Sequence, residues 1–236
     1  MAPSFDVAGW FANAPGLFRR VGAVLLRGDG LPAQVRRLVI ASDAFAQADA
    51  EVAALGREFL ARAARVLPPP TELAIAPNGF DEWREAFRIV QAREVWESFG
   101  DFVTRAQPKL GPGIKERMAF AATVTAEQAD AARKIVLAAG MHIRSVVPRG
   151  TILALPTSPS IAPPLDLGND EMESFRVRVM RLTCAAGLAG LPQMNLPAGT
   201  VAGCPAGLSL IAWAQGDEVL LDVAVELAGT CGIARP

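Results

Sequence analysis

The chain has 236 residues, of which 51% are hydrophobic, and this is enough apolar side chain to build a substantial core and to exclude disorder over the whole chain. A formal net charge of -1 gives no electrostatic basis for binding nucleic acid or an anionic membrane. No apolar run reaches transmembrane length, and Asp6 interrupts the start of the chain where a signal peptide would be basic, so we expect a soluble, cytoplasmic protein.

The cysteines, Cys184, Cys204 and Cys231, are widely spaced and form no CxxC pair, and His142 is the only histidine. This set does not have the spacing of a zinc site, so we expect no metal and no cofactor. Small buried thiols in a reducing compartment are the favoured interpretation of the cysteines.

Helical patterns recur along the chain, with apolar residues at three- and four-residue intervals. They cover residues 15–26, 46–67, 81–105, 114–122, 125–140, 171–186 and 217–229. Asn13 is the expected N-cap of the first helix, with Pro15 just inside it, and 28–30 ends that helix. The aromatic stripe of 81–105 is interpreted as core rather than as a ligand site.

Short apolar runs between these helices predict buried strands. They are residues 36–45, 72–76, 151–156, and two segments within 187–199 and 206–213. Strands that alternate with helices of ten to twenty residues favour a single α/β unit over two domains. The loop that leaves the strand 151–156 lies where α/β sheets place ligand-binding groups.

Some segments of the chain resemble the amidase signature family. They are residues 2–12 (similar to "SxDxxGxxAR"), 110–117, 153–164 (similar to "LLxPTxPxxAPP") and 187–199 followed by 206–210 (similar to "GLP...N.PAG...G.P.GL.L"). The aromatic helix 81–101 followed by Gly111-Pro112-Gly113-Ile114 is most similar to the branch that includes plant indole-3-acetamide hydrolases.

The resemblance implies the C-terminal part of the amidase signature fold, a mixed, largely parallel sheet with helices on both faces. It also implies hydrolysis of a carboxamide to a carboxylate and ammonia by a Ser-Ser-Lys triad and a Gly-rich oxyanion loop. In the family these groups precede the segment that begins here near Met1. We therefore expect residues 1–236 to form a single, N-terminally truncated amidase-like domain that lacks the catalytic half.

No substitute catalytic machinery is evident in the sequence. Lys109, Lys115 and Lys134 are not followed by a Gly/Ser-rich loop, and neither a GxSxG nor a Ser-x-x-Lys motif occurs. His142 has no acid nearby in sequence and is interpreted as a partly exposed structural histidine. We therefore expect no catalytic residue in this chain.

The candidate substrate-pocket residues are Arg117, Thr157, Ser158 and Asn195. Arg117 matches a position where the family's glutaminyl-type members hold a polar substrate, and a surface arginine on an amphipathic helix is the favoured alternative. Asn195 can equally satisfy backbone groups at a bend. Asp6 is expected to lie at a helix entry or to fix a turn rather than to catalyse.

Two hypotheses follow. The chain is either one half of an amidase, active on a small amide only with a partner chain that supplies the N-terminal half, or a non-catalytic remnant that acts as a binding or scaffold module. We favour the non-catalytic remnant as the description of the isolated chain, and we favour amide hydrolysis as the activity of its ancestor. An exposed sheet edge would also permit self-association.

Overall fold

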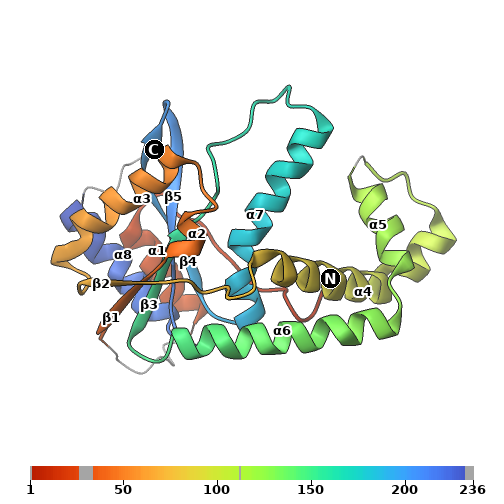
Figure 1. Ribbon diagram of the computed structural model, residues 1–236, viewed down its shortest axis with the longest axis horizontal. Helices are drawn as coiled ribbons and strands as arrows, with labels where there is room; N and C mark the ends of the chain where they lie inside the picture. Colours follow the sequence, from red (N-terminus) through yellow and green to blue (C-terminus); the bar gives the residue numbers. More distant parts are fainter. Residues whose placement is uncertain (1, 27–33, 112, 232–236) are drawn as a thin grey trace.

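The computed structural model describes residues 2–26, 34–111 and 113–231, and its centre is a five-stranded sheet (Figure 1). The strands are β1 (Arg37–Ala41), β2 (Pro70–Leu73), β3 (Thr151–Pro156), β4 (Gln193–Val201) and β5 (Cys204–Ile211), in the spatial order β2-β1-β3-β5-β4. β1 is parallel to both β2 and β3, whereas β5 is antiparallel to its neighbours β3 and β4. Only β5 is therefore reversed, which confirms the expected mixed, largely parallel sheet.

Helices cover both faces of this sheet, as expected for an α/β fold (Figure 1). They are α1 (Pro15–Leu25), α2 (Ser42–Phe45), α3 (Ala50–Arg62), a short 3-10 helix (Ala63–Arg65), α4 (Phe80–Ala106), α5 (Ile114–Thr123), α6 (Ala126–Val146), α7 (Asn169–Ala189) and α8 (Asp217–Cys231). None of the helices in the described residues is both long and apolar enough to span a membrane.

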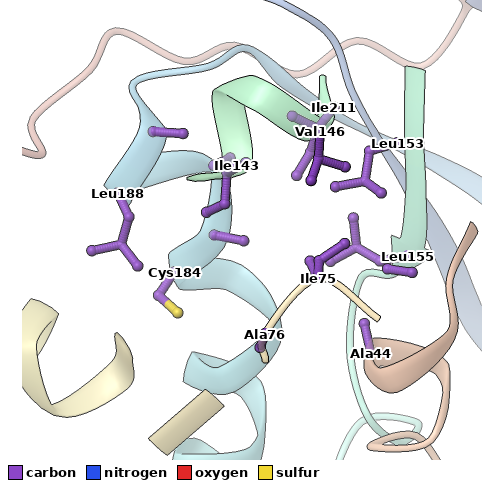
Figure 2. Close-up of a cluster of buried hydrophobic side chains, with 14 of the residues drawn as sticks. Ala44, Ile75, Ala76, Ile143, Val146, Leu153, Leu155, Cys184, Leu188 and Ile211 are labelled. Carbon is purple, nitrogen blue, oxygen red and sulfur yellow. The ribbon is translucent and has the colours of Figure 1, made fainter. Parts of the chain in front are cut away.

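The alternation of side chains along the strands divides the core into two clusters. Val39 and Leu153 belong to the cluster on the face covered by α4, α6 and α7, together with Leu182. Figure 2 shows Leu153 in this cluster with Ile143 and Ile211. On the opposite face, a second cluster joins the sheet to α3 and α8. Its largest fully buried side chains include Leu38, Phe59, Ile152, Leu208, Leu210 and Leu227.

α6 packs closely against the C-terminal end of α7 because residue 140 has no side chain. A Cβ atom at Gly140 would lie only 2.5 Å from the carbonyl oxygen of Leu188. α6 begins at Thr125, whose side chain accepts a hydrogen bond from Gln128 N–H while the Gln128 side chain accepts one from Thr125 N–H. α7 ends at Gly190, which adopts the left-handed conformation that favours glycine (φ 58°).

The first two strands differ from the sequence-based boundaries because Asp43 diverts the chain. Its carboxylate accepts hydrogen bonds from Ala44 N–H (2.9 Å) and Ala76 N–H (2.7 Å). The expected strand 36–45 therefore becomes β1 followed by the short helix α2. Ile75 and Ala76 leave the ladder and enter the core, so β2 lies at 70–73 rather than at 72–76.

Smaller corrections concern the helix ends. Ala14 rather than Asn13 is the N-cap of α1, and no side chain caps it. The helix expected at 46–67 starts at Ala50 and gives way to the 3-10 turn after Arg62. α6 continues to Val146, past the expected end at Gly140, because the small glycine fits against α7. The predicted stop at 28–30 lies outside the described residues.

The N-terminal segment is anchored to α4 by a buried carboxylate. Glu94, only 8% exposed, accepts hydrogen bonds from Ser4 N–H (3.0 Å) and Ser4 Oγ–H (2.5 Å), and the ring of Phe5 stacks on Phe87 with centroids 4.0 Å apart. Asp6 accepts from Ala2 N–H, which confirms its expected role in fixing a turn.

Candidate functional site

Polar side chains gather at the end of β3, where β5 and β4 lie beside it. Leu155 of β3 pairs with Ser209 of β5, and Ser209 in turn pairs with Asn195 of β4. Thr157 follows β3 directly and continues the pairing, because its N–H donates to the carbonyl of Gly207 (3.3 Å). The sheet register therefore places residues distant in sequence on adjacent strands and on one face.

Four of these side chains form a connected hydrogen-bond network, which we call the β3–β5–β4 network: Gln193, Asn195, Thr157 and Ser209. The Thr157 hydroxyl donates to Asn195 Oδ1 (2.6 Å) and lies 2.9 Å from Ser209 Oγ. Gln193 Nε2 donates to Ser209 Oγ (2.8 Å). Ser209 is fully buried, Thr157 and Gln193 are half-buried, and Asn195 is exposed. The network thus runs from the interior of the sheet to the surface.

Asn195 can adopt this position because residue 207 has no side chain. A Cβ atom at Gly207 would lie 2.1 Å from Asn195 Oδ1 and 3.0 Å from Asn195 Cγ. Real Cβ atoms essentially never approach other heavy atoms so closely, so Gly207 is required where the asparagine crosses β5.

The structure unites two of the candidate pocket residues, Thr157 and Asn195, but not the other two. Ser158 is half-buried and donates to the carbonyl of Ser160 within its own loop (2.8 Å). Arg117 lies exposed on α5, a helix that packs on α4 at the end of the molecule distant from the sheet (Figure 1). Within this chain, Arg117 and the β3–β5–β4 network therefore do not form one site, and a pocket role for Arg117 stays a prediction.

Sequence reasoning missed Gln193 and Ser209. Gln193 lies two residues before Asn195, and in a strand that spacing puts both side chains on one face. Ser209 is a single hydroxyl within the apolar run 208–212, and a fully buried hydroxyl needs a hydrogen-bond partner. These two patterns could have indicated both residues.

A second polar cluster anchors α7 near a cavity of about 230 Å³. Arg181 donates to both carboxylate oxygens of Asp81 (2.9 and 2.8 Å), and Arg178 donates to Asp49 (2.6 Å). The hydrogen bond from Arg181 holds the pKa of Asp81 below its ordinary value, and that from Arg178, followed by one from Ser160, does the same for Asp49. These paired charges support α7 structurally.

The remaining reactive side chains have structural surroundings. Burial raises the pKa of the Cys184 thiol to about 12, so this cysteine is part of the core and a poor nucleophile. His142 is half-buried and its Nε2 lies 3.0 Å from the carbonyl oxygen of Ile75, which confirms it as a partly exposed structural histidine. Among the described residues, no cluster of His, Cys, Asp and Glu is placed to hold a metal ion.

Chemically, the β3–β5–β4 network consists of two hydroxyls and two carboxamides. These groups can donate to and accept from a neutral polar ligand, but no lysine, histidine or carboxylate belongs to the network. A serine or threonine hydroxyl without an adjacent base is a weak nucleophile. The arrangement is therefore suited to binding and orienting a ligand rather than to attacking it.

Comparisons with known proteins show which proteins the chain is similar to. No protein-family model matches the chain. It is 27% identical to "Amidase 1" of Arabidopsis thaliana over 97% of its length and 26% identical to "Outer envelope protein 64, chloroplastic" of Arabidopsis thaliana over 94%. The chain spans 61% and 42% of the lengths of these two relatives.

Solved structures show the same fold. One described as an amidase superposes with a TM-score of 0.76 at 18% identity, covering 92% of this chain and 51% of that protein. A bacterial aryl acylamidase of the amidase signature enzymes gives a TM-score of 0.68 at 14% identity, covering 86% of this chain and 44% of that protein. Over the segment that it shares with these proteins, the chain has the fold of the amidase signature enzymes, and its sequence is similar to that of proteins named as amidases.

Proposed function

We propose that this chain contributes the substrate-binding wall of a carboxamide hydrolase and that a catalytic segment outside these 236 residues supplies the reactive groups. The observation that carries the proposal is the β3–β5–β4 network, a set of neutral donors and acceptors at the end of a central strand. In α/β sheets, this is the position where ligand-binding groups collect. The relationship to proteins named as amidases supports an amide as the ligand.

In this proposal the division of labour follows from the residue types. The catalytic segment brings a serine nucleophile and backbone N–H groups that bind the oxyanion. It also brings a second serine and a lysine, which accept and return the proton of the nucleophile. Attack on the carbonyl carbon breaks the C–N bond and releases ammonia, and water then cleaves the acyl–serine ester to give the carboxylate. The present chain orients the amide throughout, which needs hydrogen bonds but no titrating group.

The edge of β4 is the proposed contact with that catalytic segment. Ala212 N–H donates to the carbonyl of Pro192 (3.1 Å), so by the alternation of an antiparallel ladder the backbone groups of Gln193 and Asn195 point away from β5. Further along β4, the backbone is not free to pair with another strand. Pro197 has no N–H, and the carbonyl of Ala198 accepts from Arg62 (3.1 Å). A short added strand is the geometry that fits.

The opposite edge of the sheet is less suited to such a contact. β2 has only four residues and begins with Pro70, and its Glu72 is ion-paired to Arg57 (2.6 Å). Short, charged, proline-bearing edges are those that discourage strand addition. The free segment of β4 therefore remains the favoured docking edge, for the catalytic segment or, in its absence, for a second copy of this chain.

The proposal is tested by reconstitution. The chain is co-expressed with the part of Arabidopsis thaliana Amidase 1 that it does not match, and ammonia release is measured with indole-3-acetamide and with propionamide. We expect hydrolysis above that of either polypeptide alone, and none when the nucleophilic serine of the added segment is replaced by alanine. A stable complex without hydrolysis of any amide would contradict the enzymatic proposal.

A non-catalytic binding or scaffold module is the second candidate. It is favoured by the relative that is named as an outer envelope protein rather than as an enzyme, over 94% of this chain. In that case the same co-expression gives a complex, or a homodimer of this chain, with no ammonia released. A cytoplasmic location stays a prediction under either function.

A further inference from the structure

The hydroxyls of the β3–β5–β4 network impose a direction on it. Thr157 has one hydroxyl proton, and it is donated to Asn195 Oδ1. Thr157 Oγ1 must then accept the contact from Ser209, which uses the only hydroxyl proton of Ser209. Ser209 Oγ in turn accepts from Gln193 Nε2. The donors therefore all run one way, from Gln193 through Ser209 and Thr157 to Asn195.

This direction determines which polar atoms remain for a ligand. Asn195 uses its oxygen within the network, and Gln193 uses its nitrogen. In the part of the chain that the structure describes, neither Asn195 Nδ2 nor Gln193 Oε1 has a protein partner. The two side chains lie on one face of β4, so they offer an N–H donor and a C=O acceptor side by side.

A primary carboxamide has the complementary pair of groups. Its carbonyl oxygen accepts from Asn195 Nδ2 and its NH₂ group donates to Gln193 Oε1. A carboxylate matches only the first contact, because it has no proton to donate and its second oxygen would face the oxygen of Gln193. The site would therefore hold an amide more tightly than the acid formed from it.

We propose that Ser209 is a positioning residue that orients this network so that it recognises primary carboxamides and discriminates against carboxylates. The inference rests on the proposed function for its choice of an amide as the biological ligand, but its geometry comes from the network alone. Ser209 is suited to the role because it is fully buried and pairs on both sides, so its hydroxyl has no water with which to exchange. Loss of the hydroxyl would release Gln193 and Thr157 together.

Probe binding to the full chain tests the inference without any catalysis. The ¹⁵N-labelled protein is titrated with propionamide and with propionate while the side-chain NH₂ signals of Asn195 and Gln193 are followed by NMR. We expect propionamide to shift the Asn195 signal, and propionate to bind about 2- to 10-fold more weakly, the ratio that corresponds to one lost hydrogen bond. Equal affinity for the two probes, or no shift at Asn195, overturns the inference.

Variants distinguish a positioning role of Ser209 from a general effect on folding stability. Ser209→Ala should weaken propionamide binding about 2- to 10-fold and abolish the preference over propionate. Because a buried substitution can perturb folding, Thr157→Val and Thr157→Ser form a second, half-exposed pair. The valine lacks the hydroxyl at nearly the same shape and should lose the preference, whereas the serine should keep it. A Thr157→Val protein that still prefers the amide refutes the directional network.

The outcomes also distinguish the inference from the proposed function. If the reconstituted enzyme hydrolyses amides but Ser209→Ala leaves KM unchanged, the positioning role fails while the proposed function stands. If the chain alone prefers propionamide and no catalytic segment restores hydrolysis, the recognition site stands while the enzymatic proposal fails.

Discussion

Substitution of Gly207 by alanine should disable the β3–β5–β4 network while leaving the fold intact. The new methyl group would lie 2.1 Å from Asn195 Oδ1, more than 1 Å inside the ordinary contact range that begins at 3.4 Å. Asn195 is exposed, so its side chain can rotate into solvent instead of displacing the backbone of β4. The rotation breaks the 2.6 Å hydrogen bond from Thr157.

The expected change in stability is small because two effects oppose each other. Loss of one hydrogen bond costs about 0.5–1.5 kcal/mol, and replacing a strand glycine by alanine returns roughly 0.5–1 kcal/mol of backbone entropy. The net change in the free energy of unfolding is then within about 1 kcal/mol, which corresponds to no more than about 4 °C in the unfolding midpoint.

Circular-dichroism melts and NMR titration with propionamide measure the two consequences separately. Gly229→Ala is the matched control, because a Cβ atom there meets nothing within 4 Å, and it should leave probe binding unchanged. Should Gly207→Ala retain the Asn195 response, or lower the unfolding free energy by more than about 3 kcal/mol, the steric reasoning is wrong.

Further predictions concern the packing and charges that support the site. Gly140→Ala should destabilise the protein by about 1–3 kcal/mol in urea unfolding, since the methyl group collides with a carbonyl of α7, whereas Gly229→Ala, the same change in open helix, should be neutral or stabilising. Ser4→Ala removes a donor to a buried carboxylate of α4 and should cost about 1.5–3 kcal/mol; a loss below about 0.5 kcal/mol would show that the N-terminal anchor is unimportant. The pKa of Asp49 is lowered by Arg178, so this pair stabilises α7 above the ordinary value of 3.8 and is lost as pH falls through the lower folded value. The hydrogen-exchange protection factors of α7, which are corrected for the intrinsic pH dependence of exchange, should fall on acidification, and Asp49→Asn should flatten that dependence; unchanged pH dependence of the protection factors in the variant would contradict the assignment.

Most helices and strands could be predicted from the sequence because the spacing of apolar residues indicates which side chains are buried. The run 151–156 is apolar throughout and became the fully buried strand β3. The aromatic stripe of 81–105 became α4, with Trp83 and Phe87 in the core, but Phe102 near its C-terminal end is 53% exposed. The boundaries near Asp43 were not readable, because a carboxylate that bonds Ala76 across the sheet leaves no local signal.

The site was only partly predictable for a related reason. Thr157 and Asn195 were indicated by their positions after a strand and within a recognisable motif. The contacts of Ser209 depend on the register of three strands, which brings residue 157 beside residue 209 and residue 209 beside residue 193. That register is a tertiary property, and no short segment of the sequence contains it.

The polarity pattern of β4 links the site to the core and explains why its geometry is fixed. Met194, Leu196 and Ala198 point into the cluster shared with α3 and α8, while Gln193 and Asn195 point to the opposite face. Slippage of β4 by one residue would exchange these faces, burying two carboxamides and exposing three apolar side chains. Each fully buried aliphatic side chain contributes about 1.5–3 kcal/mol, and a carboxamide buried without partners costs about 1–3 kcal/mol. The penalty for slippage is thus several kcal/mol, so packing on one face of β4 holds the hydrogen-bonding groups on the other face in register.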